Sequence, residues 1–185
     1  IGQNKPLIWI LTASLLFMTN SMLMGAVNVY LFKDYFTNTA ALSLVGVMTT
    51  VTAFIAMPMV KPLVARFGKK EIASVGMGFA AIIYFVLFLL KDISAMTFVW
   101  IAALGMFGTA FLNVVIWAFV TDVIDYHEFL TGLREDATIY SVYSFARKVG
   151  QAVAGGLGGF LIAAVGYNAA LETQTESTLN GIHAL

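Results

Sequence analysis

The sequence predicts an all-α protein that crosses a lipid bilayer several times. Of its 185 residues, 60% are hydrophobic and 11% are charged, whereas a soluble domain carries about a quarter charged residues. The mean hydropathy is +0.88, and the charges lie in short clusters. The neutral stretches between these clusters reach the roughly 20 residues with which a helix crosses the hydrocarbon core. These stretches are residues 7–32, 35–60, 72–90, 93–121 and 149–171.

Composition also excludes several other classes of protein. The formal net charge is zero, so the chain lacks the basic surface by which proteins bind nucleic acid. There are no cysteines, which excludes disulfides, a zinc ribbon and a thiol nucleophile. A membrane β-barrel would alternate apolar and polar residues in short segments, whereas these stretches are uniformly apolar. We therefore expect neither a nucleic-acid-binding protein nor an enzyme.

The neutral stretches predict five complete transmembrane helices of one bundle that fills residues 1–185. Pro58 and Pro62 are placed around the end of the second helix, because a missing N–H group does least harm there. Residues 166–185 are expected to form an external loop and the start of a truncated last helix, so we expect a piece of a longer transporter. The five predicted helices span about residues 7–31, 41–60, 72–90, 95–120 and 138–165.

The basic residues of the connections predict the orientation of these helices. Six lie on one side of the membrane and two on the other. The positive-inside rule places the richer side in the cytoplasm. We therefore expect a multi-pass protein of the cell membrane (plasma or inner membrane) whose first residues are cytoplasmic. The cytoplasmic set is Lys5, Lys61, Arg66, Lys69, Lys70 and Arg134, and the external set is Lys33 and Lys91.

Polar residues form a stripe on the fourth predicted helix. Thr109, Asn113 and Trp117 are spaced four residues apart, which places them on one helix face. A tryptophan next to an asparagine can stack on a sugar and donate a hydrogen bond to a hydroxyl. Alternatively, Asn113 bonds to a neighbouring helix and Trp117 fills a gap.

The fifth predicted helix carries the stripe Tyr140, Ser144, Lys148 and Gln151, with Arg147 just beyond its edge. Helical phase alone does not choose between the two basic residues. A charge within a membrane is a functional-site candidate, although Arg147 can also extend to the interface and Lys148 can form a structural ion pair. The predicted membrane stretches contain no Asp or Glu, so the acids that balance Lys148 are expected outside this chain.

A charged connection follows the fourth predicted helix. Asp122, Asp125 and Glu128 could be read as a metal site, but His127 is alone and Arg134 is close in sequence. An ion-paired segment that locks the cytoplasmic side in one state fits a two-state transporter better. We therefore predict no metal and no cofactor apart from a coupling ion.

The run D-x-x-D-Y-x-E-x-x-T-G-x-R at residues 122–134 is followed by Tyr140-Ser141 and Lys148. This pattern resembles the glycoside–pentoside–hexuronide:cation symporter family of the major facilitator superfamily, and the similarity extends over the whole chain. The resemblance implies the second half of a twelve-helix fold, without its last helix. The absent N-terminal half would then hold the cation-binding carboxylates.

The resemblance also implies roles for individual residues. It places Lys148 beside the cation site, Trp117 near the sugar pocket and Ser144 on the sugar-facing wall. Because Asn113 and Tyr140 lie on the same helical stripes, we add them to the predicted substrate-binding residues. The resemblance also matches Asp125, Glu128 and Arg134 to the family's cytoplasmic gate residues.

The predicted function is symport of a sugar or glycoside with a monovalent cation, Na⁺ or H⁺, by alternating access. The expected partners are this sugar, the cation, the lipid bilayer and the missing half of the same transporter. Two alternatives remain open: a major facilitator-type carrier of a lipid or organic ion, and a non-transporting membrane sensor or scaffold.

Overall fold

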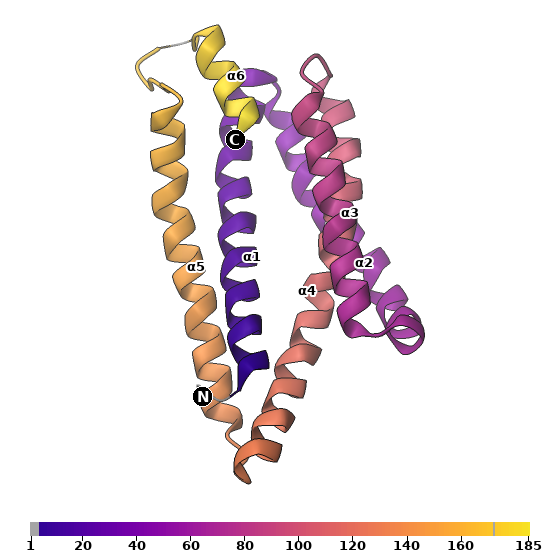
Figure 1. Ribbon diagram of the computed structural model, residues 1–185. Helices are drawn as coiled ribbons and strands as arrows, with labels where there is room; N and C mark the ends of the chain where they lie inside the picture. Colours follow the sequence, from indigo (N-terminus) through magenta and orange to yellow (C-terminus); the bar gives the residue numbers. More distant parts are fainter. Residues whose placement is uncertain (1–3, 172) are drawn as a thin grey trace. The chain divides into compact units, whose positions relative to one another are not determined.

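The computed structural model describes residues 4–171 and 173–185, so residues 1–3 and 172 of the predicted bundle lie outside it. Every regular element in the described ranges is a helix, as the sequence predicts. The chain divides into two compact units: the first combines residues 4–27 with Trp117–Ala164, and the second combines Asn28–Ile116 with Val165–Leu185. The elements are α1 (Lys5–Tyr30), the π-helix η1 (Leu31–Tyr35), α2 (Thr39–Phe67), α3 (Lys69–Leu89), α4 (Ala95–Thr131), α5 (Asp136–Ala164) and α6 (Glu176–Ala184) (Figure 1).

Four helices in the described ranges are long and apolar enough to cross a membrane: α1 with η1, α2, α3 and α4. This makes the chain a multi-pass membrane protein. The fifth predicted span forms as the 29-residue helix α5, but the structure does not confirm it as a fifth apolar span. Its polar stripe and glycines make α5 less hydrophobic than the other four.

Two predicted helix ends are wrong, and both helices are longer than expected. Pro58 and Pro62 lie inside α2, which continues to Phe67; membrane helices tolerate the loss of single N–H groups. Gly68, with a φ of 96°, ends α2 because a residue with a Cβ rarely adopts this conformation. Likewise α4 does not end near residue 120 but continues to Thr131, before Gly132 at a φ of 71°.

The last segment contains a short helix. Residues 166–185 were expected to form an external loop and the start of a truncated last helix, and the structure places α6 in this segment from Glu176. The Thr175 side chain caps this helix by accepting a hydrogen bond from the Thr178 N–H at 3.3 Å. A capped polar segment of this kind can be helical without being apolar.

In the first unit, α5 runs beside α1 (Figure 1). Small residues of α5 form the contact between the two helices. A Cβ built on Gly150 would lie 2.7 Å from the Leu15 carbonyl oxygen, and one on Gly158 would lie 3.3 Å from the Ala26 Cβ. Ala154, between these two glycines, is fully buried. The spacing of four residues therefore lets the two helix backbones approach closely.

The second unit has its own close helix contact, between α3 and α4. A Cβ on Gly76 would lie 2.6 Å from the Gly108 carbonyl oxygen, and one on Gly108 would lie 2.5 Å from the Gly76 carbonyl oxygen. Beside this contact, Ala56 of α2 packs with Ala110 and Phe111 of α4 in a buried apolar cluster. This unit is therefore built around an apolar core.

Candidate functional site

Aromatic residues of α4 and α5 form a partly exposed surface in the first unit. The rings of Trp117 and Tyr140 stack with centroids 6.3 Å apart and planes at 25°. Tyr143 is buried and meets the Trp117 ring edge to face at 5.7 Å. Trp117 and Tyr140 remain 45% and 50% exposed in the described chain. We refer to Trp117 and Tyr140 together as the aromatic platform.

Arg147 of α5 lies against the same aromatic residues. Its guanidinium carbon is 5.4 Å from the centroid of the Trp117 ring and 5.8 Å from that of Tyr143. Its Nη2 atom lies 3.7 Å from the sulfur of Met18 on α1. The Nε atom is buried and has no hydrogen-bond partner in the described part of the chain.

The structure separates the two basic residues that helical phase left equivalent. Arg147 is half-buried, whereas Lys148 is exposed. Among the described residues, no carboxylate forms an ion pair with either side chain. One residue rotates a helix by 100°, which is enough to direct Arg147 against α1 and leave Lys148 accessible.

The other predicted substrate residues divide between the two units. Ser144 lies half-buried on α5 in the first unit. Asn113 is exposed on α4 in the part that belongs to the second unit. Trp117, Tyr140 and Ser144 therefore lie in one compact unit, and the substrate role of all four residues stays a prediction.

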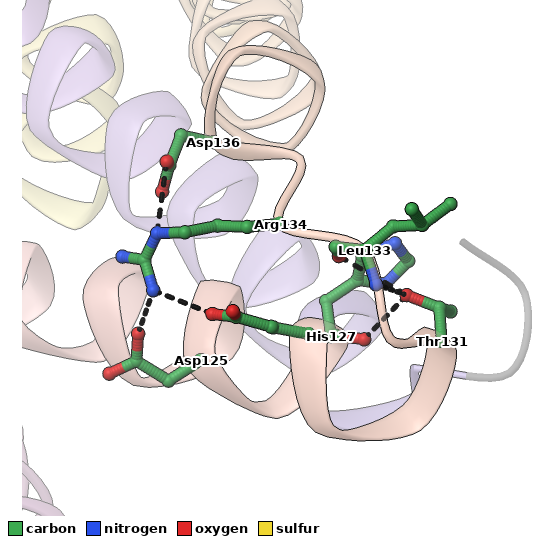
Figure 2. A network of polar contacts seen from close by, with 7 residues as sticks. Asp125, His127, Thr131, Leu133, Arg134 and Asp136 are labelled. Carbon is green, nitrogen blue, oxygen red and sulfur yellow. Dashed lines mark hydrogen bonds and ion pairs between the residues drawn. The ribbon is translucent and has the colours of Figure 1, made fainter.

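The predicted gate residues form an ion-pair network around Arg134 (Figure 2). Its Nη1 atom lies 2.9 Å from Asp125 Oδ1 and 2.8 Å from Glu128 Oε2. Its Nε atom lies 3.1 Å from Asp136 Oδ2, a partner that the sequence did not single out. Hydrogen bonds to Glu128, Asp125 and Asp136 raise the pKa of Arg134 above its usual value, so the guanidinium keeps its charge.

This network joins the end of α4 to the start of α5. Asp125 and Glu128 lie one turn apart on α4, because that helix continues past the expected boundary. Arg134 follows the turn at Gly132, and Asp136 is the first residue of α5. All four side chains are about half exposed, and water weakens such pairs. A contact of this kind is suited to breaking and re-forming.

A second polar contact lies in the same segment, and sequence reasoning missed it. His127 is buried, and its Nε2 atom lies 3.2 Å from Glu135 Oε2. Thr131 donates a hydrogen bond to the His127 carbonyl oxygen at 2.9 Å and accepts one from the Leu133 N–H at 3.3 Å (Figure 2). The turn between α4 and α5 brings His127 and Glu135 together, so their spacing in sequence carried no signal.

Asn4 is another polar residue whose position was not predicted. It is buried and caps α1 by accepting a hydrogen bond from the Leu7 N–H at 3.0 Å. Its amide nitrogen also donates to the Val123 carbonyl oxygen on α4 at 3.2 Å. Asn4 therefore attaches the start of α1 to the extended end of α4 within the first unit.

The second unit contains an apolar groove of about 630 Å³ between α2, α3 and α4. Glu71 is the one charged residue in its lining; the rest is aliphatic, aromatic or glycine. A sugar needs several hydrogen-bonding groups to be oriented. The groove therefore lacks the chemistry of a sugar site. Its aromatic lining residues are Phe67, Phe79, Phe107 and Phe111.

Comparison with known proteins identifies the family of this helical chain. The family model described as MFS/sugar transport protein matches residues 1–185. The chain belongs to this family. The sequence resemblance to glycoside–pentoside–hexuronide:cation symporters is thereby confirmed, and the family consists of transporters rather than enzymes.

Three relatives illustrate the range of the MFS/sugar transport family. The chain is 32% identical over its full length to the "Putative sulfoquinovose importer" of Escherichia coli (strain K12), and covers 39% of that protein. It is 29% identical over 98% of its length to the "Glucuronide carrier protein homolog" of the same organism, covering 40% of it. Over 98% of its length it is also 26% identical to the "Isoprimeverose transporter" of Lactiplantibacillus pentosus, covering 38% of it. The chain thus spans about two fifths of the length of these relatives.

Proposed function

We propose that the full-length protein is a secondary active transporter of the cell membrane that moves a sugar or glycoside with a monovalent cation, Na⁺ or H⁺. The aromatic platform carries this proposal. Two stacked, half-exposed rings in a helical membrane unit offer a sugar an apolar contact surface, and aromatic rings with polar edges suit ligands that are partly apolar and partly polar.

The residues around the platform have distinct roles in the proposal. Trp117 and Tyr140 stack on the sugar ring, and Ser144 donates to a hydroxyl from the same helix as Tyr140. The names of the relatives support this substrate class, because they give sugar-derived solutes, including a sulfoquinovose and a glucuronide.

Lys148 is proposed to couple the sugar to the cation. It is an exposed cation on α5 with no carboxylate partner in the described part of the chain. Carboxylates supplied by the rest of the protein would pair with Lys148 and hold the cation. Sugar and cation would then each stabilise the same conformation, which is the condition for coupling.

The network of Asp125, Glu128, Arg134 and Asp136 is proposed as a cytoplasmic gate. Its contacts would form in one state of the alternating-access cycle and break in the other. The excess of basic residues in the connections supports a cytoplasmic location for this network and for the first residues of α1.

Cation-driven uptake into vesicles that contain the full-length protein tests the proposal. A panel of glycosides is offered under a Na⁺ gradient and under a proton gradient, and at least one glycoside should accumulate under one of them. Lys148→Ala should abolish accumulation against a gradient, whereas Lys91→Ala, which removes an exposed lysine from a connection, should not. Absence of accumulation under both gradients contradicts symport.

The same assay separates the alternatives. A lipid carrier would require an apolar substrate path and would move no glycoside. A sensor or scaffold of the same fold would bind its ligand without uptake, and Lys148→Ala would leave ligand binding unchanged. The polar groups beside the aromatic platform favour the sugar over the lipid.

A further inference from the structure

Arg147 is a cation in the interior of α5 that is surrounded by neutral groups. At 1.5 Å per residue it lies about 16 Å along the helix from Asp136. Its guanidinium contacts Trp117, Tyr143 and the sulfur of Met18. The polar neighbour Gln151 also directs its amide nitrogen to the Met18 sulfur, at 3.9 Å. Within the described residues, Arg147 therefore lies among rings, a thioether and an amide.

The hydrogen-bond donors of Arg147 are largely unmatched. A guanidinium has several N–H donors and no acceptor, and a thioether sulfur is a weak acceptor. The Nε atom is buried without a partner, and no carboxylate in the described ranges forms an ion pair with this side chain. A charge removed from water requires an opposite charge or good acceptors. Arg147 thus lacks an anion.

The aromatic contacts of Arg147 leave room for such an anion. An aromatic ring attracts the guanidinium through its π-face. The N–H donors point outward in the plane of the guanidinium, in a fork that matches the oxygens of a carboxylate or another oxyanion. Stacking on Trp117 therefore holds the fork in place without occupying all of its donors.

The aromatic platform and the guanidinium share Trp117. Its ring stacks with Tyr140 at a centroid distance of 6.3 Å and lies 5.4 Å from the Arg147 guanidinium carbon. A sugar ring on the platform thus places one of its substituents beside Arg147. We infer that Arg147 binds the anionic substituent, a carboxylate or sulfonate, of an acidic sugar that lies on the aromatic platform. The inference rests on the proposed function, because it names the substrate class of that site.

A structural ion pair is the main alternative. The chain spans 39% of its relative's length, so a carboxylate from the rest of the full-length protein could pair with Arg147. Such a pair would hold the helices together whichever sugar is bound. An anion subsite instead distinguishes acidic sugars from neutral ones, so selectivity separates the two roles.

The test uses three probes that differ only at C6 of the sugar: methyl glucoside, methyl glucuronide and the 6-sulfonate of methyl glucoside. Uptake by the full-length protein in vesicles is measured at a fixed membrane potential. The wild type should have a higher kcat/KM for at least one acid than for methyl glucoside. Arg147→Gln should lower kcat/KM for that acid by on the order of tenfold or more, since charge-assisted bidentate bonds are lost. The same variant should change kcat/KM for methyl glucoside by no more than about twofold.

Two further variants keep the test decisive. Arg147→Lys retains the charge but not the fork, so its selectivity should lie between those of the wild type and Arg147→Gln. Lys91→Gln removes an exposed charge in the connection between α3 and α4. It should leave the ratio of kcat/KM for the acidic sugar to that for methyl glucoside unchanged. The preference of the wild type for acidic over neutral sugars is measured without any variant, so it still tests the inference if Arg147→Gln does not fold.

Each outcome has one meaning. Equal losses for acidic and neutral sugars in Arg147→Gln indicate a structural ion pair and overturn the inference. Uptake of methyl glucoside with exclusion of both acids by the wild type also overturns it, while the proposed sugar transport stands. If the wild type accumulates none of a broad panel of sugars under either cation gradient, the proposed function itself fails.

Discussion

The two compact units of the chain place their polar side chains differently. In the first unit, Trp117, Tyr143 and Arg147 meet in the interior of their helices. In the second unit, Tyr35 donates to the Lys91 carbonyl oxygen and His183 Nε2 contacts that of Leu90 at 3.1 Å, both at helix ends. The Thr49 hydroxyl of α2 donates to the Met106 sulfur of α4 at 3.5 Å. The first unit thus packs a charged side chain against aromatic rings in the interior of its helices.

The hydroxyl groups of α2 illustrate the difference. Thr49, Thr50 and Thr52 each donate a hydrogen bond to a carbonyl oxygen of their own helix. Their hydroxyl groups therefore have acceptors without a ligand. Among the described residues, the Arg147 Nε atom has no comparable acceptor. Because polar groups within a bilayer are costly, binding is expected beside Arg147, whose Nε atom is buried without a partner among the described residues.

The largest effect is expected from Gly76→Val in the second unit. The added Cβ would lie 2.6 Å from the Gly108 carbonyl oxygen, and backbone cannot move aside as a side chain can. Overpacking of this kind costs about 3 kcal/mol. Thermal unfolding of the purified full-length protein in detergent should show a lower Tm. Gly78→Val is the control, because its Cβ would meet no described atom of another helix within 4 Å. An equal decrease in Tm for Gly78→Val would contradict the packing role of Gly76.

Gly150→Val tests the corresponding helix contact of the first unit. Its Cβ would lie 2.7 Å from the Leu15 carbonyl oxygen and 3.2 Å from the Met18 Cβ. We expect a loss of about 2 kcal/mol, measured as a decrease in Tm. Gly155→Val on the same helix faces open space and should leave Tm nearly unchanged. Equal stability of the two variants would show that α1 and α5 do not pack through Gly150.

Trp117→Ala should weaken sugar binding about tenfold, because it removes the central ring of the aromatic platform. Trp117→Phe keeps a ring and should restore most of the affinity. Trp100→Ala, at a 59% exposed tryptophan of the second unit, is the matched control. Sugar affinity is measured by competition binding in vesicles. An equal loss of affinity in Trp117→Ala and Trp100→Ala would contradict the placement of the sugar site in the first unit.

The smallest effect is expected from Arg134→Gln. Without the guanidinium, Asp125, Glu128 and Asp136 lose their shared cation and repel one another. Because these groups are half exposed, we expect only about a threefold change in the maximal uptake rate. Added salt should reduce the difference between variant and wild type, since salt screens exposed charges. A salt-independent difference would indicate a role other than the ion pairs.

Sequence patterns anticipated the helical class because a bilayer requires long neutral stretches, and these are visible residue by residue. They were less accurate at helix ends. Hydropathy marks where the apolar residues of a helix end, whereas α4 continues through charged residues as far as Thr131. A proline also marks a lost N–H group rather than the end of a helix, so Pro58 and Pro62 lie within α2.

By itself, the sequence determined the membrane class, the order of the helices and a short set of unusual side chains, since each depends on composition along one helix. Tertiary structure decided which of these side chains meet. Arg147 rather than Lys148 joins Trp117, and Glu135 reaches His127 across the turn after α4. Helical phase orders residues around one axis, but only packing against a second helix distinguishes an accessible charge from an enclosed one.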